Sequence, residues 1–430
     1  MNFENENMNN NSVENKKVRN KLALPMCLVT FLLIIETTAI VVMGILISVY
    51  VRNTSLLKVE KSETSSDEYT KSMEILSEID KYYKGAYVND ITYDDLTLKM
   101  ANSLIASYGD KYGVYLDPEL AEESNAELNN EISGIGVLIR AELAETEEEI
   151  DRLYIIDVYD GSDALEKGMV PGSIITKMNG ENFDFSSIGY NELISQIRGK
   201  AGTYVNLTFI TPDGEEITAD IERKNVETST INYKVINNNI GYVNIRDFSA
   251  KTDEELENVL KYFENRKIEK IIFDLRDNSG GLLDTVVNML DSLLPEQDLI
   301  YIEDKDKEIV ETYTSDKKEY NFSGVCIINE NTASASELFV KSLQEAGKVT
   351  VVGNTSYGKG TVCSVIPLEN GGSLQLSTFK YLTSSKECLE GIGVIPDIEM
   401  YLPEEKEAIQ YKLDIKDDDI IIESVKLLSE

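Results

Sequence analysis

The sequence predicts an α/β domain in the C-terminal half of the chain, preceded by a smaller β-rich domain, a helical segment and one transmembrane helix. Three patterns indicate this fold class. A buried-type strand, a double-glycine turn at Gly280-Gly281 and a helix follow one another, which is the order found in α/β sheets. Short strands separated by turn signals fill residues 119–222. The apolar run 22–51 exceeds the roughly 20 residues that a helix needs to cross a bilayer.

Composition excludes several classes of protein. The chain has 430 residues, with room for two or three domains, and a formal net charge of -36 at pH 7. Because this charge would repel a phosphate backbone, nucleic acid is not expected as a partner. The four cysteines include no C-x-x-C pair, so neither a metal site nor a disulfide framework is expected, although one Cys363–Cys388 bridge stays open.

The N-terminal residues predict a membrane anchor. We assign 1–21 to a cytoplasmic tail, 22–51 to the transmembrane helix and 52–67 to a polar stalk. Basic residues cluster before the span, so the positive-inside rule predicts a single-pass protein of the cell membrane with an extracytoplasmic catalytic domain. No A-x-A-like site ends the span, which favours an uncleaved anchor over the alternative, a cleaved signal peptide. Glu36, near the middle of the span, either is protonated or shifted out of the bilayer centre, or pairs with another helix.

Residues 68–118 predict a helical segment. Apolar residues recur at helical spacing in two runs of this stretch. Thr92, with Asp95 three residues later, is typical of an N-cap. Residues 109–115 close the segment.

Residues 119–222 predict a small β-rich domain that begins with a glycine loop. Gly134, Ile135, Gly136 and Val137 place two glycines before a strand. Consecutive N–H groups in such a loop can hold a carboxylate, and the neighbouring strand edge can take an extended peptide. A tight turn is the alternative explanation of the same residues.

Residues 223–430 predict the α/β domain. An amphipathic helix is expected to begin at Thr252 and to be capped by Thr252 together with Glu255. Further along the chain, the N–H groups of Gly280 and Gly281 at a helix start would suit an oxyanion hole, and a packing turn is the alternative. The acidic end of the domain predicts a short helix or strand, without a functional interpretation.

Residues 331–362 carry the candidate chemistry. Ser334 and Ala335 belong to a cluster of small residues that leads into a helical run, and Lys359 follows between two glycines. The first N–H groups of a helix can hold an anion, a serine there is a candidate nucleophile, and a lysine amine is a candidate base. The alternative is that the serines cap the helix and that Lys359 is a solvated turn residue.

The absence of histidine sharpens this hypothesis. The chain contains no histidine, which excludes Ser-His-Asp and Cys-His arrangements within it and any His-ligated metal. In a hydrolase of this composition, a lysine or a carboxylate must move the proton, and serine with lysine is a known variant of the serine triad. Such a reaction needs no cofactor.

Two motifs resemble those of the carboxyl-terminal processing (tail-specific) serine peptidases. They are Thr332–Glu337, with the sequence TASASE, and Tyr357–Val362, with the sequence YGKGTV. The resemblance implies that Ser334 is the nucleophile and Lys359 its general base. It also implies a crotonase/Clp-protease-like fold for the catalytic domain. The oxyanion donors that it implies are the backbone N–H groups of Gly280, Gly281 and Ala335.

The other domains resemble the same family. Residues 68–118 are similar to the helical segment that precedes the peptide-binding domain in this family, and residues 119–222 resemble a PDZ domain of the bacterial type. Both come before the catalytic domain, residues 223–430. The implied partners are protein or peptide substrates with free C-termini, bound by the loop Gly134–Val137. A second copy of the chain, in a homodimer, is a further candidate partner.

Asp277 and Ser279 replace an asparagine and a proline of the family's glycine-turn motif, and two further departures from the family's pattern matter more. The residue four past the lysine is usually a glutamine that helps to orient it, but here it is Cys363, whose thiol cannot supply an amide's two donors and acceptor. Lys359 is then oriented by another group, or activity is reduced. In the family, a proline usually stands near the position of Ser384, and its absence from this chain is not expected to affect activity.

Two main hypotheses follow from the sequence. The first is a membrane-anchored serine endopeptidase of the Ser-Lys dyad type that acts through an acyl-enzyme. The second is a catalytically weakened or inactive membrane-anchored scaffold that binds peptides. A purely structural envelope protein would leave the PDZ-like segment unexplained.

Overall fold

The computed structural model describes residues 66–88, 96–143, 150–183, 190–407, 409–410 and 413–429. The expected tail, transmembrane helix and nearly all of the stalk lie outside the described residues. Within the described ranges, no helix is both long enough and apolar enough to span a bilayer. The chain divides into two compact units, Met1–Asp94 and Asp95–Glu430.

The described part of the first unit is built around one helix, α2 (Ser66–Ala86). Its apolar residues have the helical spacing expected from the sequence. Met73, Leu76 and Ile79 are nevertheless 40%, 43% and 48% exposed, so α2 does not bury its apolar face within the described part of its own unit. The cap expected at residues 92–95 lies outside the described residues.

The second unit begins with α3 (Leu96–Ser107), β1 (Val114–Leu116) and α4 (Pro118–Leu128). Asp117 caps α4, because its side chain accepts a hydrogen bond from the N–H of Leu120 at 2.9 Å. β1 pairs antiparallel with β18 (Ser373–Leu382), which comes from the other end of the chain. The expected helical segment therefore closes in a strand that joins a sheet of the C-terminal domain.

A β-rich domain follows α4. Its main sheet has the order β3-β4-β5-β7-β8, and β6 pairs with β5. Leu153, Leu193 and Phe209 are buried in a core that is separate from the cores of the C-terminal domain. The strands are β2 (Glu131–Gly134), β3 (Val137–Leu143), β4 (Ile150–Val158), β5 (Ile174–Met178), β6 (Glu181–Asn182), β7 (Tyr204–Ile210), β8 (Glu216–Glu222) and β9 (Lys224–Glu227), and the helices are α5 (Asp163–Glu166) and α6 (Tyr190–Ile197). β2 and β9 pair with each other outside the main sheet.

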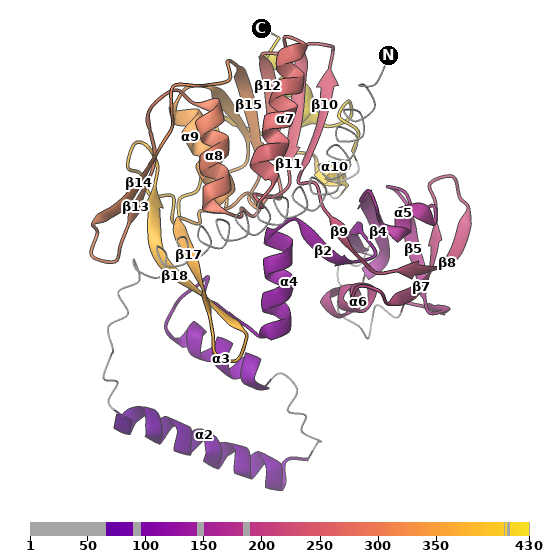
Figure 1. The fold of residues 1–430 in the computed structure, drawn as a ribbon, viewed down its shortest axis with the longest axis vertical. Helices are drawn as coiled ribbons and strands as arrows, with labels where there is room; N and C mark the ends of the chain where they lie inside the picture. Colours follow the sequence, from indigo (N-terminus) through magenta and orange to yellow (C-terminus); the bar gives the residue numbers. More distant parts are fainter. Residues whose placement is uncertain are drawn as a thin grey trace, which may run out of the picture. The chain divides into compact units, whose positions relative to one another are not determined.

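The C-terminal domain is built on a sheet with the order β10-β11-β12-β15-β16-β19 (Figure 1). β10 is antiparallel to its neighbour, and the other strands are parallel. The strands are β10 (Ile231–Ile236), β11 (Ile240–Ile245), β12 (Lys270–Asp274), β15 (Ser323–Ile328), β16 (Val349–Gly353) and β19 (Ile398–Glu399). This mostly parallel sheet is the α/β architecture that the sequence predicts.

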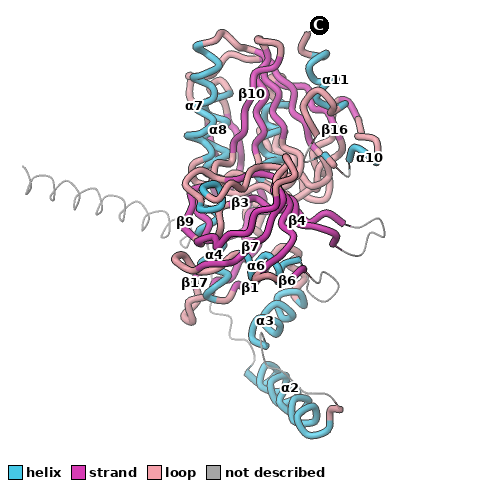
Figure 2. The backbone as a smooth tube through the Cα atoms, turned by 90° about the vertical axis from the view of Figure 1, so that its right-hand side faces the viewer, coloured by secondary structure: helices cyan, strands magenta, loops and turns pink. Residues whose placement is uncertain are grey.

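Helices cover both faces of this sheet (Figure 2). Successive residues of a strand point to opposite faces, and β12 follows this rule. Ile271 and Phe273 belong to the core on the side of α7, α8 and α9, while Ile272 packs in a second core with Ile421 of α11. Burial on both faces explains the continuous apolar run in this part of the sequence. The helices are α7 (Thr252–Asn265), α8 (Leu283–Leu293), α9 (Ala335–Glu345), α10 (Glu404–Glu407) and α11 (Asp419–Leu427).

A second sheet of the C-terminal domain is antiparallel. Its order is β1-β18-β13-β14, and β17 pairs with β18. The strands not yet described are β13 (Asp298–Glu303), β14 (Ile309–Thr314) and β17 (Thr361–Pro367). β17 starts two residues after Lys359, so this sheet continues directly from the lysine turn.

The start of α7 differs from the expected capping box. Lys251 occupies the N-cap position, Thr252 is already helical, and no side-chain cap is formed. The carboxylate of Glu255 instead accepts the N–H groups of Thr230 and Ile231, both at 2.9 Å. The prediction was wrong because Glu255 satisfies the backbone at the start of β10 rather than the start of its own helix.

A buried ion-pair cluster joins the C-terminal helix to β12. Arg276 pairs with Asp274 at 2.5 Å and with Asp418 at 2.9 Å, and these side chains are buried. Asp418 also caps α11 by accepting the N–H groups of Ile420 and Ile421. Burial lowers the pKa of Arg276, but the two carboxylates outweigh it and the pKa lies above its ordinary value. The C-terminal segment that the sequence leaves as helix or strand is thus a helix fixed to the central sheet.

Candidate active site

Three adjacent strand ends bring the expected site residues together. β12, β15 and β16 are neighbouring parallel strands, so their carboxyl ends lie at the same edge of the sheet. Gly280 and Gly281 follow β12, Ser334 follows β15, and Lys359 follows β16. The sheet topology therefore collects residues that are far apart in the sequence.

Ser334 forms the turn between β15 and α9. Its backbone has φ 58° and ψ -121°, a combination that residues other than glycine avoid. A serine in a sharp, strained turn between a strand and a helix exposes its Oγ above the sheet, which is the geometry of a nucleophile elbow. Ser334 is also the N-cap residue of α9, the position that the alternative interpretation of the sequence gives it. The backbone strain favours a functional role in addition to capping.

The carboxylate of Glu337 connects the serine turn to the lysine turn. Its Oε2 accepts the backbone N–H groups of Ser334 and Lys359, each at 2.8 Å. Its Oε1 accepts the N–H of Gly358 at 2.7 Å and the hydroxyl of Ser356 at 2.5 Å. Glu337 is fully buried at 0% exposure. This burial raises its pKa and outweighs the four hydrogen bonds, which favour the ionised form.

Tyr381 of β18 makes a second connection between the same two turns. Its hydroxyl donates to the carbonyl oxygen of Lys359 and also lies 3.2 Å from the carbonyl oxygen of Ser334. Burial, reinforced by the charge of Glu337, raises the pKa of Tyr381 well above its ordinary value. The phenol therefore stays protonated and remains a hydrogen-bond donor at any physiological pH.

Gly280 lies directly against the serine turn. A Cβ atom on Gly280 would stand 2.8 Å from Cβ of Ser334 and 3.0 Å from N of Ala335. The φ angles of Gly280 and Gly281, 110° and 142°, lie in the region that favours glycine. The N–H of Gly280 was expected to be an oxyanion donor, but in the structure it donates to Oδ1 of Asn278 at 2.9 Å. The N–H groups of Gly281 and Ala335 have no hydrogen-bond partner among the residues that the structure describes.

The amine of Lys359 lies against an aromatic ring. Its Nζ is 4.9 Å from the ring centroid of Tyr112, a residue of the segment before β1. Nζ makes no hydrogen bond within the described part of the chain, and the side chain is half-buried. Sγ of Cys363 lies 3.9 Å from Oγ of Ser377 instead of joining the lysine. Cys363 and Cys388 are both free thiols, so the bridge that the sequence leaves open is not formed.

The expected carboxylate loop lies in the β-rich domain. Gly134 ends β2 and Val137 begins β3, which is the terminal strand in the order of its sheet. Ile135 is buried. Gly136 has a φ angle of 74°, and a Cβ atom added to it would lie only 2.4 Å from Cβ of Ser162, so no larger residue fits there. This geometry is common to a tight turn and to a carboxylate loop. The structure forms no hydrogen bond between residues 134–137 and the Ser334 or Lys359 turns.

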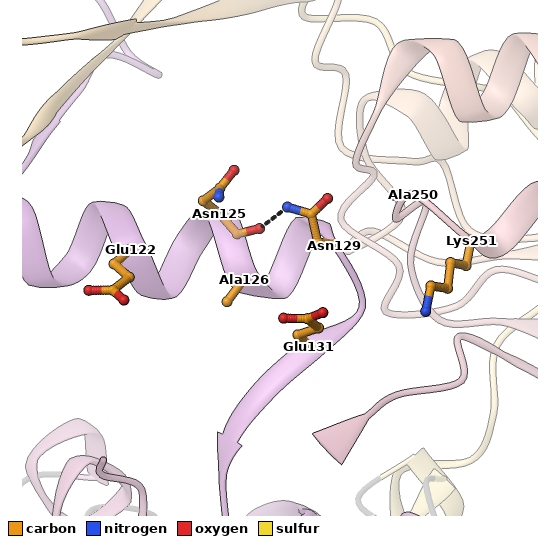
Figure 3. Close-up of a pocket in the computed structure, with 7 residues that line it drawn as sticks. All are labelled: Glu122, Asn125, Ala126, Asn129, Glu131, Ala250 and Lys251. Atoms are coloured by element: carbon orange, nitrogen blue, oxygen red, sulfur yellow. Dashed lines mark hydrogen bonds between the residues drawn. The ribbon is translucent and has the colours of Figure 1, made fainter. Parts of the chain in front are cut away.

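A surface hollow of about 470 Å³ lies elsewhere in the second unit (Figure 3). In it, the side-chain amide of Asn129 donates to the backbone oxygen of Asn125 at 2.7 Å. Its lining is formed by Glu122, Asn125, Ala126, Asn129, Glu131, Ala250 and Lys251. Since none of the residues expected from the sequence lines this hollow, it is separate from the candidate active site.

Three residues complete the site but have weak signals in the sequence. Glu337 stands three residues after Ser334, which is the spacing of a capping box, and this spacing could have indicated its bond to the Ser334 N–H. Tyr381 belongs to β18 of the second sheet, and Tyr112 belongs to the segment before β1. Their positions depend on long-range strand pairing, so no local pattern indicates them.

Comparisons with known proteins show which family this chain resembles. Residues 239–400 match the model of peptidase family S41. Carboxy-terminal processing protease CtpA of Bacillus subtilis is 28% identical over 355 residues, which cover 82% of this chain and 73% of the relative. The carboxy-terminal-processing protease of Bartonella bacilliformis is 29% identical over 366 residues, covering 81% of each chain.

A solved structure of an S41 protease from Bacteroides fragilis aligns with a TM-score of 0.56 at 17% identity, and covers 80% of this chain and 92% of the other. It supports the fold. Residues 239–400 thus resemble the domain of peptidase family S41, and the chain is a serine-type peptidase with homologues among the carboxy-terminal processing proteases.

Proposed function

We propose that this peptidase is a membrane-anchored endopeptidase that uses a dyad of Ser334 and Lys359 on protein substrates held by their C-termini. One observation carries the proposal. Oε2 of Glu337 accepts the N–H groups of both residues, so one buried acceptor fixes the two turns to each other. The strained backbone of Ser334 and the second connection through Tyr381 support the same assignment.

The proposed reaction needs a neutral lysine amine. Nζ of Lys359 takes the proton of Ser334 Oγ while this oxygen attacks the carbonyl carbon of the scissile bond. The carbon–nitrogen bond then breaks, the lysine gives its proton to the leaving amine, and an acyl ester stays on Ser334. A water molecule, deprotonated by the same amine, hydrolyses the ester and regenerates the serine.

The oxyanion of this reaction is assigned to two backbone donors. The N–H groups of Gly281 and Ala335 have no other partner among the described residues, whereas that of Gly280 donates to Asn278. The role of Gly280 is then to let the glycine turn approach the serine turn closely, since a side chain at Gly280 would collide with Ser334. Removing one oxyanion donor typically costs a serine protease about 10²-fold or more in rate.

We assign substrate binding to the β-rich domain, which we interpret as PDZ-like. The loop Gly134–Val137 leads directly into β3, and β3 is the terminal strand of its sheet. An extended peptide can add to such an edge through backbone hydrogen bonds, and the loop's N–H groups can then hold the terminal carboxylate. The β-rich domain would thus select substrates by their free C-terminus.

We assign the membrane anchor to residues 22–51, on the basis of their apolar sequence and the basic cluster that precedes them. External protease applied to intact cells should therefore remove the domains after the span and leave the N-terminal tail. Protection of these domains until the cells are lysed would contradict the proposed orientation.

The dyad is tested by labelling with a fluorophosphonate, which reacts with activated serines, alongside cleavage of casein. We expect wild-type protein to be labelled and to cleave casein, and Ser334→Ala to do neither. The competing scaffold hypothesis, suggested by Cys363, predicts that wild type and Ser334→Ala behave alike in both assays. Cleavage by Ser334→Ala would place the nucleophile at another residue and overturn the proposal.

A further inference from the structure

We propose that Tyr112 is the positioning residue of Lys359, the role that the side chain at position 363 does not perform. This inference rests on the proposed function, because it assigns a part in the Ser334–Lys359 reaction. Nζ of Lys359 lies 4.9 Å from the centroid of the Tyr112 ring. A protonated lysine amine within about 6 Å of a tyrosine ring face is attracted by the ring's quadrupole.

The Tyr112 ring is itself tied to the lysine turn. Its hydroxyl donates to Oε1 of Glu390 at 3.1 Å, and Oε2 of the same carboxylate accepts the N–H of Gly360 at 2.7 Å. Gly360 directly follows Lys359, so Glu390 links the ring to the backbone that carries the amine. The ring and the lysine turn therefore keep a fixed separation.

The backbone around Tyr112 is fixed from β18. Nε2 of Gln375 donates to the carbonyl oxygen of Tyr112 at 3.0 Å. The carboxylate of Asp110 accepts the N–H and the hydroxyl of Ser377 at 3.0 and 2.7 Å, and also the N–H of Tyr112 at 3.1 Å. Burial raises the pKa of Asp110, but the bonds to Ser377 outweigh it and the pKa lies below its ordinary value. These backbone contacts hold Tyr112 in place without its hydroxyl, and the bond to Glu390 is an additional restraint.

Cys363 is engaged elsewhere. Its Sγ lies 3.9 Å from Oγ of Ser377, at a register shift between β17 and β18. Within the described residues, Lys359 Nζ makes no hydrogen bond, so the ring of Tyr112 is the contact that restrains it. The ring attracts the ammonium form without a hydrogen bond that would occupy the nitrogen, so the lone pair of the deprotonated amine is free to take a proton from Ser334.

The same neighbourhood contains a matched lysine–tyrosine pair. Nζ of Lys111 lies 4.5 Å from the ring centroid of Tyr357, a distance close to that of the Lys359–Tyr112 pair. Lys111 also lies 5.0 Å from the Tyr112 ring. Removing the Tyr357 ring should therefore change the surroundings of Lys111 and leave those of Lys359 unchanged.

The first arm of the test measures the reactivity of the Lys359 amine and is independent of peptidase activity. Proteins carrying Ser334→Ala are acetylated with an N-hydroxysuccinimide ester, and modification of Lys359 is quantified by peptide mass spectrometry. Adding Tyr112→Leu should raise the acetylation rate of Lys359 about 3- to 30-fold, because the amine is released from the ring face. Adding Tyr112→Phe should leave it near that of the parent, and Tyr357→Leu should accelerate Lys111 alone. Equal Lys359 rates in all four proteins would overturn the inference.

The second arm measures peptide hydrolysis by the corresponding variants with Ser334 intact. Tyr112→Leu should lower kcat about 10-fold with KM unchanged, and Tyr112→Phe should restore kcat, because the ring face and not the hydroxyl holds the amine. Thermal melting identifies any variant that is misfolded, and Tyr112→Phe controls for general loss of packing. An unchanged kcat in Tyr112→Leu, or an equal loss in Tyr112→Phe, would overturn the assignment. If wild-type protein is inactive, the proposed function fails, while the acetylation rates still decide whether Tyr112 holds Lys359.

Discussion

Ser334 and Lys359 donate their backbone N–H groups to the same atom, Oε2 of Glu337, each at 2.8 Å. The two residues follow different strands of the central sheet, and this shared acceptor fixes their backbones relative to each other. Because the carboxylate is fully buried, water cannot replace it. Positioning of this kind would let Ser334 and Lys359 act as the proposed pair.

Glu337→Gln should separate the two turns. A glutamine side chain has one acceptor oxygen and an NH₂ group, which cannot accept from the four donors that surround the carboxylate. Leaving buried donors unsatisfied should lower the free energy of unfolding by about 1–3 kcal/mol. Displacement of the serine or the lysine should lower kcat/KM by about 10²-fold.

Glu345→Gln is the matched control for this change. Glu345 ends the same helix, α9, and its carboxylate accepts hydrogen bonds from Ser384 and Ser385 on the outside of the site. This variant should lose stability and keep its peptidase activity. Equal activities of Glu337→Gln and Glu345→Gln, measured on the same peptide, would contradict the role of Glu337.

Gly280→Ala should displace the serine turn. The added Cβ would lie 2.8 Å from Cβ of Ser334, closer than such atoms approach in proteins, so the turn must shift. We expect a loss of about 10²-fold in kcat/KM. Gly347→Ala is the control, since Gly347 also has a positive φ of 68° but has nothing within 4 Å of an added Cβ. It should cost about 1 kcal/mol of stability and leave kcat/KM unchanged. The idea fails if both variants keep full activity.

Asp418→Asn should destabilise the C-terminal domain. It leaves the buried guanidinium of Arg276 with one carboxylate instead of two, while the cap of α11 can persist. Breaking a buried ion pair typically costs about 3–5 kcal/mol. Urea unfolding followed by circular dichroism measures the change. The exposed neighbour Asp417 is the control, because Asp417→Asn should stay within about 0.5 kcal/mol of wild type. Similar unfolding midpoints for the two variants would argue against the ion-pair cluster.

The substrate's C-terminus provides a separate test. A peptide with a free, apolar C-terminus should be cleaved better than its C-terminally amidated twin, because amidation removes the charge that the Gly134–Val137 loop would bind. Initial rates measured at low substrate concentration give the comparison directly. Equal rates for both peptides would show that this loop does not select substrates by their carboxylate.

The sequence predicts much of this fold because its signals are local. The βα order around Gly280 and the apolar strand of β12 indicate an α/β sheet, and the structure has one. The small-residue run Ala333–Ser336 leads into a helical pattern, and α9 begins within that run, at Ala335. Such patterns depend on neighbours within one or two turns of the chain, which a sequence displays directly.

The remaining features depend on pairing between distant segments. Glu255 has the spacing of a helix cap, but tertiary structure uses it for the backbone at β10. Tyr112 reaches Lys359 because β1 joins β18, and Tyr381 reaches both turns because β18 pairs with β17. No local pattern encodes the contacts of Glu255, Tyr112 and Tyr381. The Gly280 N–H is a different case, because it was expected to be an oxyanion donor but donates to the side chain of Asn278, two residues earlier, in a local contact of the Asx-turn type.

The central claim, that Lys359 is the general base for Ser334, is tested most directly by peptide hydrolysis in Lys359→Arg beside wild type. Arginine keeps a cation but supplies no neutral amine, because it stays protonated at any accessible pH. The account predicts that Lys359→Arg, like Lys359→Ala, is as inactive as Ser334→Ala. Substantial hydrolysis by Lys359→Arg would contradict the dyad and leave Ser334 without a base in a chain that has no histidine.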